Sequence, residues 1–79
     1  FPACHASLNG VAIKIWRAVL QEGAQGVAGN VLAVDKHGIT VACGKDALRL
    51  EVLQRPGGKA QPAAQFLQAV PVRPGESFS

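Results

Sequence analysis

Alternating apolar and polar residues at positions 47–53 predict the strand around which the rest of the chain is organised. Leu48, Leu50 and Val52 recur at every second position, with charged residues between them. A period of two is typical of a strand with one buried face, so we expect these three side chains in the core.

A short polar loop follows this strand at residues 54–59, which read QRPGGK. The proline has no amide hydrogen to give to a sheet, and the two glycines allow backbone angles that other residues avoid. The sequence therefore predicts a tight, shaped loop that carries two cations.

Residues 11–20 predict a longer strand that is apolar at alternate positions as far as Ile15. Continuing the same phase would bury Arg17 without a partner, which is costly for a charged group. A bulge near Trp16 and Arg17 would turn Arg17 outward and Ala18 inward. We expect Trp16 to be a large core or rim side chain, and stacking on a nucleic-acid base is the less favoured alternative.

Two more strands are predicted at residues 30–35 and 39–43. The first is apolar at four successive positions, so we expect it to be covered on both faces. A hairpin joins the two, and we expect Gly38 in it to have the positive φ that such loops often need. Residues 1–9 show no clear period and are interpreted as a leading segment.

Residues 62–69 predict one short helix, with Pro62 in its first turn. The apolar stripe has helical spacing and should dock on the strands: Ala63, Phe66, Leu67 and Val70. Residues 76–79 are expected to add an edge strand. Short strands at close spacing favour a mainly β sandwich or small barrel, formed as a single domain by residues 1–79.

The composition adds a net charge of +3 and two cysteines, with no apolar run long enough to cross a membrane. We predict free thiols at Cys4 and Cys43, with Cys43 buried at a strand end, in a cytoplasmic monomer. Cys4 and His5 are adjacent, but no close-spaced second pair of ligands completes a metal site. Phosphate-loop, dinucleotide and nucleophile–base motifs are also missing, so we predict no catalytic residues and no cofactor for this chain.

Seven short motifs, in this order, resemble the C-terminal domain of the methionyl-tRNA formyltransferase family. They are VAIKIWRA at 11–18, GNVL at 29–32, GITVACG at 38–44, LRLEVLQ at 48–54, LQRPGGK at 53–59, AQFL at 64–67 and PGE at 74–76. The resemblance covers residues 10–78. Pro62 departs from the family pattern, which often has a capping Ser there, and this bears on where the helix begins.

The resemblance implies a small open Greek-key β-barrel of the oligonucleotide-binding type with one short helix. It also implies an N-terminal catalytic domain that uses 10-formyltetrahydrofolate to formylate the methionine of initiator Met-tRNA. The C-terminal domain would help to hold that tRNA through basic residues and would not itself be catalytic. Related domains also occur in folate dehydrogenases and sugar-nucleotide formyltransferases, where tRNA is not the substrate. The alternative function is therefore that of a structural domain that only braces a catalytic partner.

The mild basic excess favours the tRNA interpretation. The candidate residues form one expected phosphate-facing patch: Lys14, Arg17, Arg55, Lys59 and, in the extended tail, Arg73. Lys36 and Lys45 occupy hairpin turns that we expect to lie outside this patch. The alternative is that all these residues are scattered surface charges.

Overall fold

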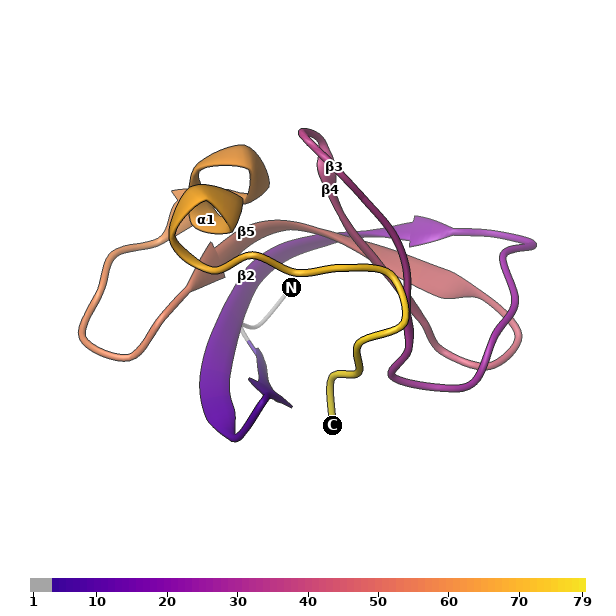
Figure 1. The fold of residues 1–79 in the computed structure, drawn as a ribbon. Coiled ribbons are helices and arrows are strands. Elements are labelled where there is room, and N and C mark those ends of the chain that lie inside the picture. The colour runs from indigo at the N-terminus through magenta and orange to yellow at the C-terminus, as the bar shows by residue number, and fades with distance from the viewer. Residues whose placement is uncertain (1–3) are drawn as a thin grey trace.

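The computed structural model describes residues 4–79, which form a curved antiparallel sheet of six strands and one helix (Figure 1). The elements in chain order are β1 (Cys4–Leu8), β2 (Val11–Gln21), β3 (Val31–Asp35), β4 (Gly38–Ala42), β5 (Ala47–Gln54), β6 (Gln61–Pro62) and α1 (Ala63–Ala69). The strand order is β1-β2-β5-β4-β3, and β6 pairs with β5. No helix in this range is long and apolar enough to cross a membrane.

The strand order is that of a Greek key. Strands β3, β4 and β5 follow one another through short turns. A longer connection, residues 22–30, joins β2 to β3, and it lets β2 lie beside β5 at the other side of this three-strand unit. This confirms the prediction of a mainly β, open fold with one short helix. The sheet does not close into a barrel, because β1 and β3 do not pair with each other.

The C-terminal segment, residues 75–79, crosses the gap between β1 and β3 (Figure 1). The Ser7 N–H donates to the Ser79 carbonyl at 3.0 Å, and the Ser79 N–H donates back at 2.9 Å. On the other side, the Phe78 N–H donates to the Gly29 carbonyl at 2.8 Å. The edge strand predicted at residues 76–79 therefore takes the form of isolated bridges to both ends of the sheet rather than a continuous strand.

Helix α1 packs over the sheet through the predicted apolar stripe. Ala63 and Phe66 are buried, and Leu67 and Val70 pack against the core. A helix of seven residues is too short to be stable alone, so this docking stabilises it. Pro62 is not in the first turn but precedes it as an extended N-cap residue (φ −57°, ψ 151°), because it pairs with β5 as part of β6.

The predicted bulge is present where β2 pairs with β5. Ile15 pairs with Leu53, Arg17 with Val52 and Ala18 with Leu50, so Trp16 and Glu51 have no residue opposite them. Arg17 is exposed and Ala18 packs against the core, as expected. Trp16 is not a core residue, since the bulge leaves it 44% exposed on the outer face.

The same irregularity changes which face of β5 is buried. Leu50 and Leu53 are buried, whereas Val52 is only half-buried. The expectation that Val52 lies in the core with Leu48 and Leu50 was therefore wrong at this position. The strand changes phase at Glu51, beside the bulge of β2.

Three further expectations were wrong. Residues 4–8 of the leading segment form β1, which enters a tight hairpin at Asn9 and Gly10, both with positive φ (52° and 81°). Gly38 does not have a positive φ; its Cα lies against the Arg49 side chain and a backbone carbonyl, where a Cβ would collide. Strand β3 is not covered on both faces, because Ala33 is exposed.

Cys43 is a free thiol, as predicted, but it is exposed rather than buried because it follows the last residue of β4. The side chain of Cys4 lies outside the described residues.

Candidate nucleic-acid interface

A tight turn shapes the basic loop after β5. The Gly58 N–H donates to the Arg55 carbonyl at 3.0 Å, and Gly57 has a φ of 75°. Proline at the second position and a positive-φ glycine at the third are the features of a type II turn. The predicted shape of this loop is therefore confirmed, and it orients Arg55 outward.

A chain of side-chain contacts fastens this loop to β2. The Trp16 Nε1–H donates to Gln54 Oε1 at 2.6 Å, and Gln54 Nε2 donates to the Gly58 carbonyl at 2.8 Å. The Lys14 ammonium lies 4.2 Å from the centroid of the Trp16 ring, within the range of a cation–π interaction. The outward tryptophan thus restrains both the loop and the lysine beside it.

Lys14 and Arg55 line one hollow of about 300 Å³, which we call the loop hollow. Its other lining residues are His5, Ala12, Gln54, Pro56 and Gly57. Two cations on one concavity raise the local positive potential, and such a surface attracts anions.

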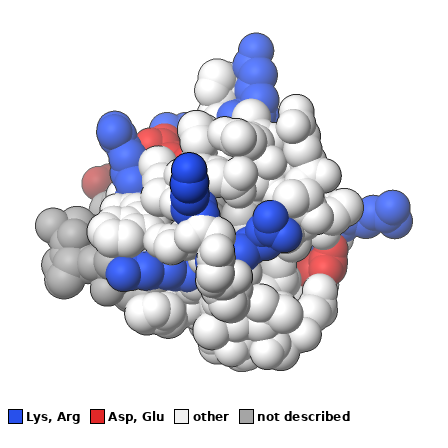
Figure 2. All heavy atoms as spheres, turned by 90° about the vertical axis from the view of Figure 1, so that its left-hand side faces the viewer, with Lys and Arg blue, Asp and Glu red and all other residues white. Residues whose placement is uncertain are grey.

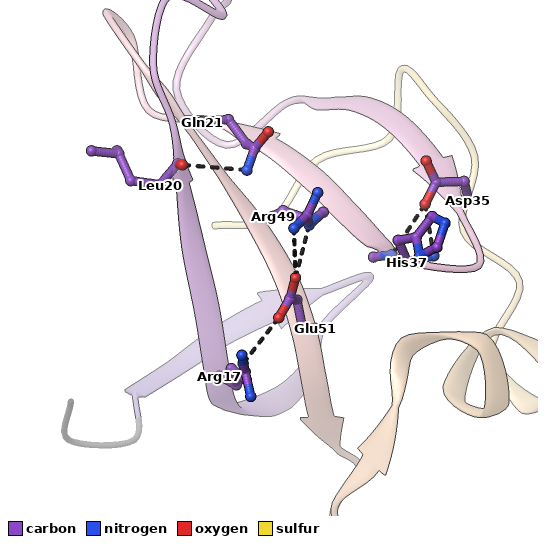
Figure 3. A network of polar contacts seen from close by, with 8 residues as sticks. Arg17, Leu20, Gln21, Asp35, His37, Arg49 and Glu51 are labelled. Atoms are coloured by element: carbon purple, nitrogen blue, oxygen red, sulfur yellow. Dashed lines mark hydrogen bonds and ion pairs between the residues drawn. The ribbon is translucent and has the colours of Figure 1, made fainter.

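A second hollow of about 530 Å³ lies between β5 and the turn that joins β3 to β4; we call it the hairpin hollow. Its lining consists of Arg17, Lys36, His37, Arg49, Glu51, Val52, Pro62 and Ala63. The Glu51 carboxylate lies between two guanidinium groups (Figure 3), 3.0 Å from Arg17 Nε and 2.8 Å from Arg49 Nη2.

The five predicted residues therefore do not all line one concavity. Lys14 and Arg55 share the loop hollow, and Arg17 lines the hairpin hollow. Lys59 is exposed on the loop itself, and Arg73 is exposed after α1, where its backbone N–H donates to Glu76 at 2.7 Å. Figure 2 shows Lys and Arg side chains spread over the face that carries this loop, with acidic side chains toward its margins.

Several residues of these hollows were missed from the sequence. His5 belongs to β1, which the Asn9-Gly10 turn signal could have predicted. Lys36 and Arg49 reach the hairpin hollow through the pairing of β4 with β5, and local spacing does not show such a pairing.

The described residues form a small, mainly β domain with a basic face. Residues 1–71 match the family described as formyl transferase, C-terminal domain, and the chain belongs to that family. Over its whole length the chain is 48% identical to the methionyl-tRNA formyltransferase of Ralstonia nicotianae, of which it covers 25%. Identity is 46% with the enzyme of Nitrosomonas eutropha (99% of this chain, 25% of the relative) and 58% with that of Ectopseudomonas mendocina (75% and 18%).

These comparisons confirm the family resemblance inferred from the seven motifs. The chain spans about a quarter of the length of the curated relatives it matches, and it corresponds to their C-terminal region.

Proposed function

We propose that this chain helps to bind and position initiator Met-tRNA for a methionyl-tRNA formyltransferase. The N-terminal catalytic domain of that parent enzyme would transfer the formyl group from 10-formyltetrahydrofolate. The names of the relatives and the share of their length that the chain covers support this proposal. Its main structural support is the loop hollow, where Lys14 and Arg55 flank one concavity.

The loop hollow suits a phosphate group of the RNA backbone. An ammonium group acts as a point charge, and a guanidinium group can donate two parallel hydrogen bonds to phosphate oxygens. Because the contacts from Trp16 and Gln54 already restrain the site, less side-chain freedom is lost on binding. Phosphate contacts position a nucleic acid without reading its sequence, so this grip would be weakly specific.

Lys59 belongs to the same proposed patch, because it lies on the loop that carries Arg55. Arg73 is exposed in the segment after α1, and we propose it as an outlying contact.

The test is binding of fluorescently labelled initiator tRNA to the chain across a range of NaCl concentrations. If roughly three phosphates are neutralised, log K should fall with log salt at a slope of about −2 to −3. The double variant Lys14→Ala/Arg55→Ala should bind more weakly and flatten this slope by about one to two units. Lys45→Ala, an exposed lysine in the turn after β4, is the control and should change the slope less. An unchanged affinity and slope in the double variant would show that the loop hollow does not hold the RNA.

The second candidate is a domain that only braces its catalytic partner. The exposed Val11, Leu20 and Val27 side chains favour it, because apolar groups on a surface are suited to protein contacts. A chain that binds no tRNA even at low salt would support the bracing role over the tRNA role.

We further propose that the chain is not catalytic by itself and works as a cytoplasmic monomer. The imidazole of His5 lines the loop hollow with two cations, the amide of Gln54 and apolar groups, and neither a nucleophile nor a carboxylate stands beside it among the described residues of that lining. The free thiol of Cys43 is typical of a reducing compartment. Incubation with methionyl-tRNA and 10-formyltetrahydrofolate should give no product above the uncatalysed control. Formylation above that level would contradict this assignment.

A further inference from the structure

We propose that the hairpin hollow is a second binding site for a phosphate of the RNA backbone, with Glu51 reducing its charge in the free protein. This inference rests on the proposed function and adds residues to it that the sequence did not suggest. The hollow brings together Arg17 from β2, Arg49 from β5 and Lys36 from the turn after β3.

The charges around the hollow favour an anion. Three cations (Arg17, Arg49 and Lys36) and one carboxylate (Glu51) give a net charge of +2. Val52, Pro62 and Ala63 form an apolar portion of the wall, so the polar groups of the hollow are the cations and the one carboxylate beside His37.

The geometry of Glu51 explains how Arg17 and Arg49 lie close together. One carboxylate oxygen lies 3.0 Å from Arg17 Nε, and the other accepts from Arg49 Nε at 2.9 Å and lies 2.8 Å from Arg49 Nη2 (Figure 3). Glu51 is only 19% exposed, whereas the Arg17 side chain is 69% exposed. The carboxylate is therefore more buried than the two arginine side chains, and the Arg17 side chain remains accessible to an incoming phosphate.

The two hollows lie along the same strand. Lys14 and Arg17 are three residues apart on β2, roughly 10 Å at the usual rise of a strand. One RNA strand carries several phosphates over that distance, so a single strand can contact both hollows.

Replacing Glu51 by glutamine tests the role of the carboxylate. Glu51→Gln keeps the size of the side chain and removes one negative charge beside two guanidinium groups. We expect initiator tRNA to bind about threefold to fivefold more tightly, with a salt slope steeper by about one unit. Equal or weaker binding would overturn the proposal.

Glu22→Gln is the matched control, since it removes the same charge from an exposed residue beyond the far end of β2. Glu22 lies five positions from Arg17, about 16 Å along an extended chain. It lies three positions, about 10 Å, from Val19, which pairs with Arg49. Salt at 0.15 M screens charges beyond about 8 Å. An effect on tRNA affinity as large as that of Glu51→Gln would mean that only the total charge of the chain matters, and this would overturn the proposed second site. Circular dichroism on each variant checks that it remains folded.

Lys36→Ala tests the hollow from its other side. It should weaken tRNA binding and flatten the salt slope by about one unit, and Lys45→Ala should change both less. Both lysines are exposed in turns of the same sheet, but only Lys36 lines the hairpin hollow. A difference in tRNA affinity between the two variants therefore measures the contribution of the hollow. Equal effects of the two variants would overturn the proposal.

Nuclear magnetic resonance distinguishes RNA from free phosphate as the ligand. The Arg17 and Arg49 Nε–H signals should shift when tRNA is added, and inorganic phosphate should shift the same signals only at much higher concentration. Shifts with inorganic phosphate but not with tRNA would overturn the assignment to RNA. If the chain binds no tRNA at all, the proposed function itself fails; if it binds tRNA while these signals stay unmoved, only the second site fails.

Discussion

Gln54 shows how one side chain can shape a binding surface without carrying charge. Its amide accepts from Trp16 on β2 and donates to the Gly58 carbonyl in the loop. A glutamine amide offers both an acceptor and donors, so it can join two segments that have no direct hydrogen bond between them. The position of Arg55 beside Lys14 depends on this link.

We predict that Gln54→Leu weakens tRNA binding by about twofold to tenfold and leaves the salt slope unchanged. A net contribution of about 0.5–1.5 kcal/mol per hydrogen bond sets the size of this effect. The charge count does not change, so the number of neutralised phosphates should not change either. Anisotropy titrations across NaCl concentrations measure both quantities.

The control is Gln68→Leu, which makes the same substitution at an exposed position of α1. A flatter slope in Gln54→Leu would mean that the loop loses a phosphate contact altogether. An unchanged affinity would mean that the link does not position the loop. Either result would contradict the prediction.

At the level of elements, the sequence predicted best those segments whose apolar pattern is compatible with only one low-energy structure. The bulge in β2 could be predicted because only a change of phase keeps Arg17 out of the core. Helix α1 could be predicted because the apolar stripe that begins at Ala63 and ends at its C-cap, Val70, has helical spacing. Strand β5 was different, since Val52 and Leu53 are both apolar and either one can face the core.

The remaining errors come from pairing over long distances in the sequence. Strand β6 has two residues and no pattern of its own, so only its contact with β5 defines it. Lys14 and Arg55 could be grouped because both were expected to face outward, Lys14 on β2 and Arg55 in the loop after β5. The hairpin hollow could not, since the pairing of β4 with β5 is what brings Lys36 to Arg49.

At the level of the whole molecule, the C-terminal segment joins strands that the sheet itself leaves apart. Gly29 makes this possible on the β3 side, because a Cβ at this position would collide with the Phe78 carbonyl oxygen. The Phe78 N–H donates to the Gly29 carbonyl at 2.8 Å, so the two backbones meet directly.

We predict that Gly29→Ala lowers the free energy of unfolding by roughly 2–4 kcal/mol, through backbone strain and the displaced C-terminal segment. Gly23→Ala is the matched control: its φ is similarly positive (80° against 93°), but a Cβ there would meet open space. Strain alone should cost the control about 1–2 kcal/mol. Urea unfolding of both variants measures the difference, and equal losses would show that the close approach to Phe78 is not needed.

The order of synthesis gives this closure a further consequence. Residues 75–79 leave the ribosome after every strand that they connect. Until they arrive, β1 and β3 each present unpaired backbone groups along an outer edge, and such edges readily pair with other chains. Residues 75–79, which follow all these strands in the chain, therefore protect the nascent domain from aggregation.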